Sequence, residues 1–280
     1  MTIAPREFDQ ARLSSAKQNL LSEGWCILPG ILNADEARVA VERLWRAAEE
    51  SRRRGGATYA QSLDPNEANV RVFGLLELDQ LFRDLIRHPV ALDLVRSLLG
   101  DEILISNFTA NIARPGAGSM SLHSDQALVV PEPWLEPWAI NIIWCLADTR
   151  FENGGTQYLP GSHRISRLPE LDPIDTSRMK AFEAPAGSIV AMDGRMWHTS
   201  GPNQTPDEDR PLLFGYYTRD FLRPQVNWNA ALSTETIAEL DEDFLVLLGL
   251  EGAANVAQGR RLLSSDLGGL KGMSADMEKQ

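Results

Sequence analysis

A histidine and an aspartate lie two residues apart in the stretch SMSLHSDQALVV, residues 119–130. If this stretch is extended, His123 and Asp125 point to the same face, so an imidazole nitrogen and a carboxylate oxygen approach one point. Two such side chains hold a metal ion weakly. Two histidines and one carboxylate form the site of non-haem Fe(II) oxygenases, which leaves three coordination positions open. Without a third ligand, a polar patch at a strand end explains the pair better.

The third ligand has to come from the remaining histidines, because the chain contains only 4 in all. His88 precedes Pro89 at the end of a predicted helix, where the helix dipole favours a cation, and this indicates a structural role. His163 lies in the turn LPGSHRIS. His198 follows an apolar strand and an Asp-Gly turn that would return it to the same sheet system as the first pair. The pattern therefore favours His198.

The elements that must position these side chains change in character near residue 100. Before it the pattern is mainly helical, with predicted helices at 10–24, 33–54 and, as two shorter pieces, 78–100. After it the hydrophobic period is two, with predicted strands at 102–116, 138–148, 155–161, 187–193, 195–201 and 211–220. In the first of these strands Asn107, Thr109 and Asn111 share one face. This order is typical of a two-sheet jelly roll or barrel.

No internal repeat or long linker divides the chain, so we expect one domain over residues 1–280. Its parts would be a mainly helical region at about 1–100, a jelly-roll core at about 101–225, and a C-terminal helix and tail at 226–280. The last helical pattern is STETIAELDEDFLVLLGL, and the segment from about residue 252 is rich in Gly and Ser.

The composition limits the partners that the chain can take. A net charge of −12 repels phosphate backbones and anionic lipid, so we expect no nucleic acid and no membrane as partner. Cys26 and Cys145 are flanked by apolar residues, which indicates buried thiols in a reducing compartment. No secretory leader and no apolar run of the ~20 residues that a membrane span needs are apparent, so we expect a cytoplasmic location.

Three separated motifs carry a resemblance to a known family. The stretches LHSDQ (122–126), NIIWCLADTRFENGGTQYLPGSHR (141–164) and WHTSGPNQTPDEDRP (197–211) occur in the order and with the spacing of the phytanoyl-CoA dioxygenase family. These are Fe(II)- and 2-oxoglutarate-dependent oxygenases, and the similarity spans roughly residues 18–225. It implies a mainly β fold with flanking helices, built on a double-stranded β-helix (jelly roll, cupin-like) core.

The resemblance also implies the roles of individual residues. Its metal ligands fall on His123, Asp125 and His198, while the histidine of PGSH, His163, is not a ligand. Arg210, twelve residues after the distal histidine, falls on the position that binds the far carboxylate of 2-oxoglutarate, and a guanidinium suits that task because its planar fork binds a carboxylate through two hydrogen bonds. Further candidates for co-substrate contacts are Ser200, Thr156, Asn141 and Asn107.

The implied activity is oxidation, in most family members hydroxylation, of an unactivated C–H bond, with O2 and 2-oxoglutarate consumed, succinate and CO2 released, and ascorbate as a reductant in vitro. The substrate would be a small molecule. The phosphates of a CoA ester would need a cluster of Lys and Arg near the pocket, but the main basic run of the chain, SRRR, ends an N-terminal helix. We therefore expect a largely apolar metabolite or natural product without a CoA handle. Trp134 and Trp138 in a Pro-rich loop would contact it. The alternatives are an acyl-CoA hydroxylase, a zinc hydrolase and a binding module without turnover.

Overall fold

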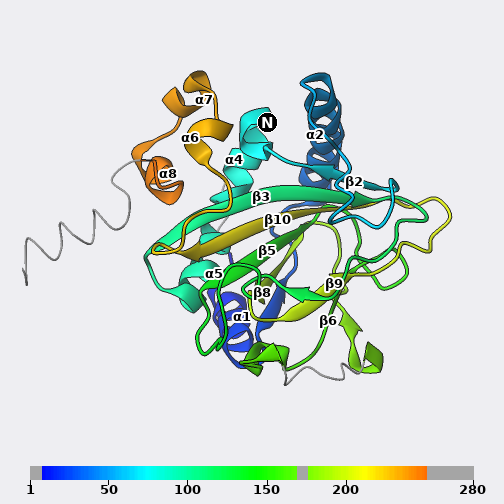
Figure 1. Cartoon of the computed structure of the whole chain (residues 1–280), viewed down its shortest axis with the longest axis vertical. Helices are drawn as coiled ribbons and strands as arrows, with labels where there is room; N and C mark the ends of the chain where they lie inside the picture. Colours follow the sequence, from blue (N-terminus) through cyan, green and yellow to red (C-terminus); the bar gives the residue numbers. More distant parts are fainter. Residues whose placement is uncertain (1–7, 169–175, 251–280) are drawn as a thin grey trace, which may run out of the picture.

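The computed structural model of the chain describes residues 8–168 and 176–250 (Figure 1). Two antiparallel sheets face each other in it, one of six strands and one of four. The larger sheet has the order β1 (Trp25–Leu28), β8 (Ser188–Asp193), β5 (Ala139–Cys145), β10 (Arg210–Arg219), β3 (Ile103–Ala113), β2 (Asn69–Val72). The smaller sheet has the order β4 (His123–Ser124), β9 (Trp197–Ser200), β6 (Thr156–Tyr158), β7 (Lys180–Ala181). The predicted mainly β fold with a jelly-roll core is confirmed.

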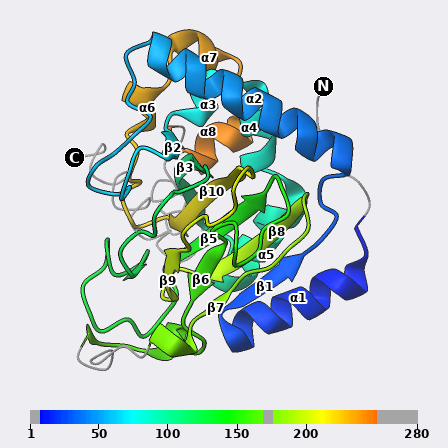
Figure 2. The same ribbon diagram turned by 90° about the vertical axis from the view of Figure 1, so that its right-hand side faces the viewer.

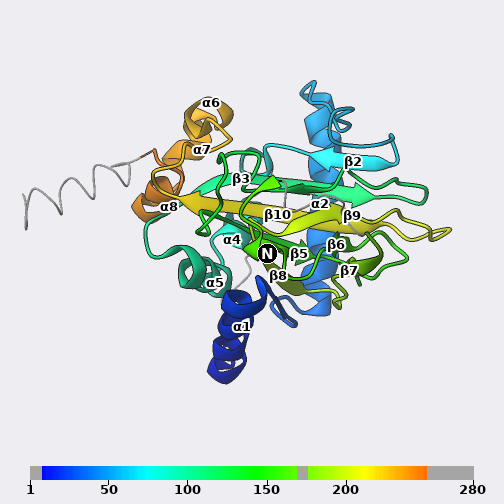
Figure 3. The same cartoon turned by 60° about the horizontal axis from the view of Figure 1, so that its bottom comes forward.

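The helices lie outside this pair of sheets. They are α1 (Gln10–Glu23), α2 (Ala34–Arg53), α3 (Leu75–Leu78), α4 (Gln80–Ile86), α5 (Pro89–Leu99), α6 (Trp228–Ala231), α7 (Thr234–Ala238) and α8 (Glu242–Leu247), with 3-10 turns η1 (Ser162–Arg164) and η3 (Thr176–Arg178). Figure 2 shows α2 beside β2 and β3 at one end of the larger sheet and α1 beside β1 at the other. In Figure 3, α6, α7 and α8 gather near one end of β3 and β10. None of the described helices combines the length and apolar character that a membrane crossing requires.

The predicted helix ends agree with the structure where a capping residue marks them. Asn33 caps α2 through a capping box, in which its side chain accepts from the Glu36 N–H and the Glu36 carboxylate accepts from the Asn33 N–H. Gly24 ends α1 with a φ of 80°, a conformation that favours glycine. The single C-terminal helix is wrong: Ser233 and Asp241 each cap a separate short helix, α7 and α8. The predicted Gly- and Ser-rich tail lies in 251–280, outside the described residues.

Two strands lie inside the region that the sequence indicated as mainly helical. β1 pairs with β8 and β2 pairs with β3, so the two form the edges of the larger sheet. Each is only four residues long, which is too short for a period-two pattern to be distinguished from its helical surroundings. The region predicted as mainly helical therefore contributes two strands to the larger sheet.

Two sets of buried side chains hold the layers together. The helices cover the outer face of the larger sheet, where Leu20, Phe82 and Trp144 are fully buried in one cluster. Between the two sheets a second cluster includes Ile143 from β5 and Phe182 beside β7. This cluster fills only part of the space between the sheets, and the remaining part contains the cavity described below.

The free thiols of Cys26 and Cys145 are buried, and burial raises their pKa to about 12 and about 11.

Gly187→Ala is expected to destabilise the fold more than Gly30→Ala. Both glycines have positive φ, 82° and 79°, so each substitution costs roughly 1–2 kcal/mol of backbone strain. Only at Gly187 would the new Cβ also lie 2.1 Å from a backbone oxygen, that of Leu32, whereas Gly30 has nothing within 4 Å. Urea unfolding of the two variants measures the difference, and equal losses would show that the junction of Leu32 and Gly187 relaxes freely.

Candidate active site

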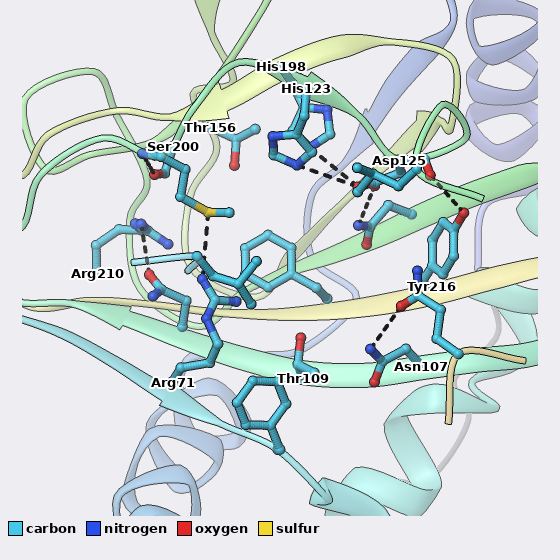
Figure 4. Close-up of a pocket in the computed structure, with 18 residues that line it drawn as sticks. Arg71, Asn107, Thr109, His123, Asp125, Thr156, His198, Ser200, Arg210 and Tyr216 are labelled. Atoms are coloured by element: carbon cyan, nitrogen blue, oxygen red, sulfur yellow. Dashed lines mark hydrogen bonds and ion pairs between the residues drawn. The ribbon is translucent and has the colours of Figure 1, made fainter. Parts of the chain in front are cut away.

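His123, Asp125 and His198 converge between the two sheets (Figure 4). His123 and His198 are directly opposite each other on the paired strands β4 and β9, and their ring centroids lie 4.4 Å apart. Asp125 follows β4 by one residue. One ligand atom from each of the three lies within 4.8 Å of the other two. The structure thus brings together the three residues that the sequence singled out.

The hydrogen bonds of the two histidines leave the same nitrogen available on both rings. His123 Nδ1 lies 2.8 Å from the Ser121 carbonyl and His198 Nδ1 lies 3.0 Å from the Met196 carbonyl. A carbonyl only accepts, so each Nδ1 carries the proton and each Nε2 keeps its lone pair. The Nε2 atoms are 3.6 and 3.9 Å from Asp125 Oδ1, too far for good hydrogen bonds. Three metal-ligand atoms that face one point without hydrogen-bonding one another match a metal site.

Asp125 is held as a carboxylate. Burial raises its pKa, but the electrostatic influence of the two imidazoles and the hydrogen bond from Asn141 outweigh burial and bring the pKa to about 2. Its second oxygen, Oδ2, accepts from Asn141 Nδ2 at 3.0 Å, and its backbone carbonyl accepts from Tyr216 Oη at 3.2 Å. Burial lowers the pKa of His198, which keeps that imidazole neutral. The set therefore presents two ring nitrogens and one anionic oxygen to a cation.

A cavity of about 180 Å³ adjoins these three residues. All five residues that the sequence proposed for the co-substrate line it: Asn107, Asn141, Thr156, Ser200 and Arg210. Thr156 and Ser200 are opposite each other on β6 and β9. The Ser200 hydroxyl accepts from the Met120 N–H at 3.0 Å, which leaves its own proton free to donate.

Arg210 is the most unusual group in the cavity. Its side chain is 1% exposed and its Nη2 donates to Asn111 Oδ1 at 3.3 Å, while Nε and Nη1 have no partner among the described residues. Burial lowers its pKa to about 10, against the opposing effect of Cys145. A buried cation without a counter-ion is costly, so the site is built for an anion that supplies the missing hydrogen bonds. This is the fit expected of a carboxylate-bearing co-substrate.

A second arginine in the cavity was missed from the sequence. Arg71 lies on β2 opposite Asn111, and its guanidinium binds Asp64 through Nε and through Nη2, the latter at 2.6 Å. The Asp64 side chain is fully buried, so the pair is close to neutral. Arg71 Nη2 also lies 3.5 Å from Met120 Sδ. The alternation in NVRV was the only sequence signal, and it fell within the region assigned to helices.

The register of the sheet sets the order of groups along the cavity. Arg210 pairs with Ala113 and Tyr216 pairs with Asn107, so Asn107 lies six residues farther along β3. At about 3.3 Å per residue this is roughly 20 Å along the strand, and Figure 4 shows Asn107 and Arg210 on opposite sides of the cavity. Asn107 therefore lies toward the end of the cavity away from Arg210, and its predicted co-substrate role stays a prediction. Asn141 donates to Asp125.

Trp134 and Trp138 are not among the side chains that line the cavity. Trp134 is buried against Trp197, and its Nε1 donates to the Val130 carbonyl at 2.7 Å. Trp138 packs edge-on against Phe221. Both rings pack against neighbouring aromatic side chains, and the prediction that one of them contacts substrate stays a prediction. Leu128, from the start of the same loop, lines the cavity instead.

The other two histidines lie outside the site. Burial lowers the pKa of His163 and of His88, so both are neutral. His163 fills the space beside Gly24, where an added Cβ would lie 2.6 Å from its ring. His88 precedes the N-terminus of α5 and packs against Trp144, so its role is structural, as predicted. It is not the cation at a helix end that the sequence indicated, because burial lowers its pKa.

The chain matches one protein family and several curated dioxygenases. The phytanoyl-CoA dioxygenase (PhyH) family model matches residues 21–211. The chain is 49% identical over 247 residues to Dioxygenase af480 of Aspergillus fumigatus, with 88% of this chain and 80% of that protein covered. It is 30% identical over 159 residues to the multifunctional dioxygenase ausE of Penicillium brasilianum, with 52% of each covered.

Two solved structures with a metal and 2-oxoglutarate bound share this fold. HygX from Streptomyces hygroscopicus, solved with nickel and 2-oxoglutarate, superposes with a TM-score of 0.61 at 15% identity, covering 78% of this chain and 90% of that one. The epimerase SnoN, solved with Fe3+, alpha ketoglutarate and nogalamycin RO, superposes with a TM-score of 0.60 at 18% identity, covering 78% and 88%. At these identities the likeness establishes the fold.

Proposed function

Because the chain belongs to the phytanoyl-CoA dioxygenase family and is a non-haem Fe(II)- and 2-oxoglutarate-dependent dioxygenase, we propose that it hydroxylates an unactivated C–H bond of a small, largely apolar metabolite. The observation that carries the proposal is Arg210, whose buried guanidinium lacks hydrogen-bond partners at Nε and Nη1 among the described residues. It lines the same cavity as His123, Asp125 and His198. A metal site and an unpaired cation in one cavity are what a metal-chelating dicarboxylate requires.

The three converging side chains would hold iron through the Nε2 atoms of His123 and His198 and through the Asp125 carboxylate. Iron and 2-oxoglutarate, when bound, supply the oxidising power for C–H oxidation with O2, and succinate and CO2 are the by-products. The backbone carbonyls at Nδ1 fix both imidazoles in the tautomer that exposes Nε2. Asn141 fixes the carboxylate through Oδ2. These contacts keep the ligand geometry in place between turnovers.

Arg210 would bind the far carboxylate of 2-oxoglutarate with the donors that now lack partners. Ser200 and Thr156, side by side across β9 and β6, would donate their hydroxyl protons to the same molecule. Arg71 adds N–H donors at this end of the cavity with little net charge, since Asp64 balances it. Burial of these groups strengthens their interactions, because water is excluded from around them.

The positions of the basic residues argue against a CoA substrate. In the run at the end of α2, Arg53 and Arg54 both pair with Glu50, and Arg52 donates to Thr58. These guanidinium groups are committed to protein partners rather than available as a phosphate cluster. The free, buried thiols of Cys26 and Cys145 support the cytoplasmic location expected from the sequence.

A zinc hydrolase is the less favoured interpretation of the same residues. Zinc would bind two histidines and an aspartate equally well and activate water. Such an enzyme would leave the Arg210 guanidinium buried without an anion at Nε and Nη1, at least within the described part of the chain. The arrangement at Arg210 therefore favours 2-oxoglutarate chemistry.

Succinate formation tests the proposal. Purified protein with Fe(II), ascorbate and O2 is expected to convert 2-oxoglutarate to succinate slowly on its own. Compact apolar molecules that fit the cavity should accelerate the conversion, whereas fatty acyl-CoA thioesters should not. Strict dependence on a CoA thioester would overturn the substrate proposal, and the absence of any 2-oxoglutarate consumption across the panel would overturn the proposed reaction.

A further inference from the structure

We propose that the end of the cavity remote from Arg210 recognises its apolar substrate by one oxygen atom, a hydroxyl or carbonyl, which binds the amide pair of Asn107 and Gln225. Both residues line the cavity. The inference rests on the proposed function, because it takes this cavity to be the active site. It adds a substrate class, an uncharged and largely apolar alcohol or ketone, and the residues that select it.

The amide pair joins residues far apart in the chain. Asn107 Nδ2 donates to Gln225 Oε1 at 3.0 Å across 118 positions of sequence. The backbone at Gln225 is fixed by β3, since its N–H donates to Ser106 Oγ at 3.0 Å and the Val226 N–H donates to the Ser106 carbonyl at 3.1 Å. Ser106 itself is 1% exposed. The position of Gln225 is therefore set by the sheet and not by chance contact.

An amide pair joined by one hydrogen bond still has an amide N–H donor and a carbonyl acceptor that can bind a ligand. The hydrogen bond between the two side chains uses Asn107 Nδ2 and Gln225 Oε1, which leaves Asn107 Oδ1 and Gln225 Nε2 for a ligand. A hydroxyl satisfies both, because it donates and accepts, and a carbonyl satisfies the free N–H. An anion would find no formal positive charge in the amides, since the two arginines of the cavity lie toward its other end, at the level of Asn111 and Ala113.

The rim of the cavity is apolar. Leu63, Phe73 and Leu128 are 44%, 41% and 67% exposed, and all three line this cavity although they come from three separate segments of the chain. Exposed large apolar side chains that gather around one opening indicate a binding surface for an apolar ligand. Two contacts of Arg71 hold the segment that carries Leu63. The Arg71 side chain pairs with Asp64, and the Arg71 backbone N–H donates to the Thr58 carbonyl at 2.9 Å.

The register places the oxygen contact away from the metal ligands. Asn107 and Asn141 both pair with Tyr216, one on each side of β10, so they are two strand spacings apart, roughly 10 Å. Asn141 bonds Asp125. The substrate oxygen is therefore a handle several bonds from the oxidised carbon, not the reacting group.

Titration with a matched pair of bicyclic probes tests the inference. Protein loaded with Ni(II), which does not support turnover, and saturated with 2-oxoglutarate is titrated calorimetrically with 2-decalol and with decalin. The alcohol is expected to bind between about twofold and tenfold more tightly, the range for one neutral hydrogen bond. In Gln225→Leu that preference should disappear through weaker binding of the alcohol, with affinity for decalin unchanged. Gln18→Leu, at an exposed position of α1, is the matched control.

Three results would overturn the inference. The two probes could bind the wild-type protein with equal affinity, Gln225→Leu could weaken the binding of both probes equally, or either probe could fail to bind at its solubility limit. Binding of 2-oxoglutarate, measured in the same samples, separates this result from failure of the proposed function. If the co-substrate binds and the probes do not discriminate, only the substrate handle is wrong. If the co-substrate does not bind either, the cavity is not a dioxygenase site.

Discussion

His198→Ala is expected to abolish succinate formation and to remove stoichiometric metal binding. The substitution deletes one of the two histidine nitrogens that face Asp125, and the two ligands that remain hold a metal ion weakly. Metal content after dialysis against Fe(II) or Ni(II), measured by atomic emission, gives the binding directly. Turnover of 2-oxoglutarate gives its consequence.

His163→Ala is the matched control, since His163 is a buried neutral histidine outside the cavity. It should lower stability, because the ring fills space beside Gly24, while metal content stays near one ion per chain. Loss of the metal in His163→Ala together with its retention in His198→Ala would reverse the assignment of the third ligand.

Arg210→Ala is expected to weaken binding of 2-oxoglutarate by two orders of magnitude or more. Removing one partner of a buried charge pair costs about 3–5 kcal/mol, and in the complex Arg210 is the buried partner of a carboxylate. Metal content should be unchanged, because Arg210 is not among the converging metal-binding side chains. Calorimetric titration of Ni(II)-loaded protein with 2-oxoglutarate measures the loss.

Arg38→Ala, which removes an arginine from the exposed face of α2, provides the comparison. The ligand-free Arg210→Ala protein should unfold no more easily than the wild type, because the substitution removes a buried cation without a counter-ion. Unchanged affinity for 2-oxoglutarate in Arg210→Ala would show that another cation binds the co-substrate, and Arg71 would be the first to examine.

The parts of the site that lie on long strands could be predicted from the sequence. Asn107, Thr109 and Asn111 alternate with apolar residues along β3, and all three line the cavity as the period-two pattern indicates. The spacing of His123 and Asp125 placed both at one point although β4 itself is only two residues long. Local geometry sufficed in both cases.

The parts that depend on long-range pairing could not be predicted. Arg71 reaches the cavity because the four-residue strand β2 adds to the edge of the sheet, which no local pattern distinguishes from the helices around it. Gln225 reaches it through hydrogen bonds to Ser106, a contact 119 positions away in sequence. The packing of Trp134 and Trp138 is also long-range: Trp134 lies against Trp197 and Trp138 lies against Phe221, and neither contact could be predicted from the Pro-rich loop alone.

A crystal structure of the protein with Ni(II) and 2-oxoglutarate tests the central claim most directly. The account predicts one metal ion bound by His123, Asp125 and His198, chelated by 2-oxoglutarate whose far carboxylate receives hydrogen bonds from Arg210 Nε or Nη1. A metal ion at these residues with 2-oxoglutarate absent from the cavity, or with its far carboxylate away from Arg210, would contradict it.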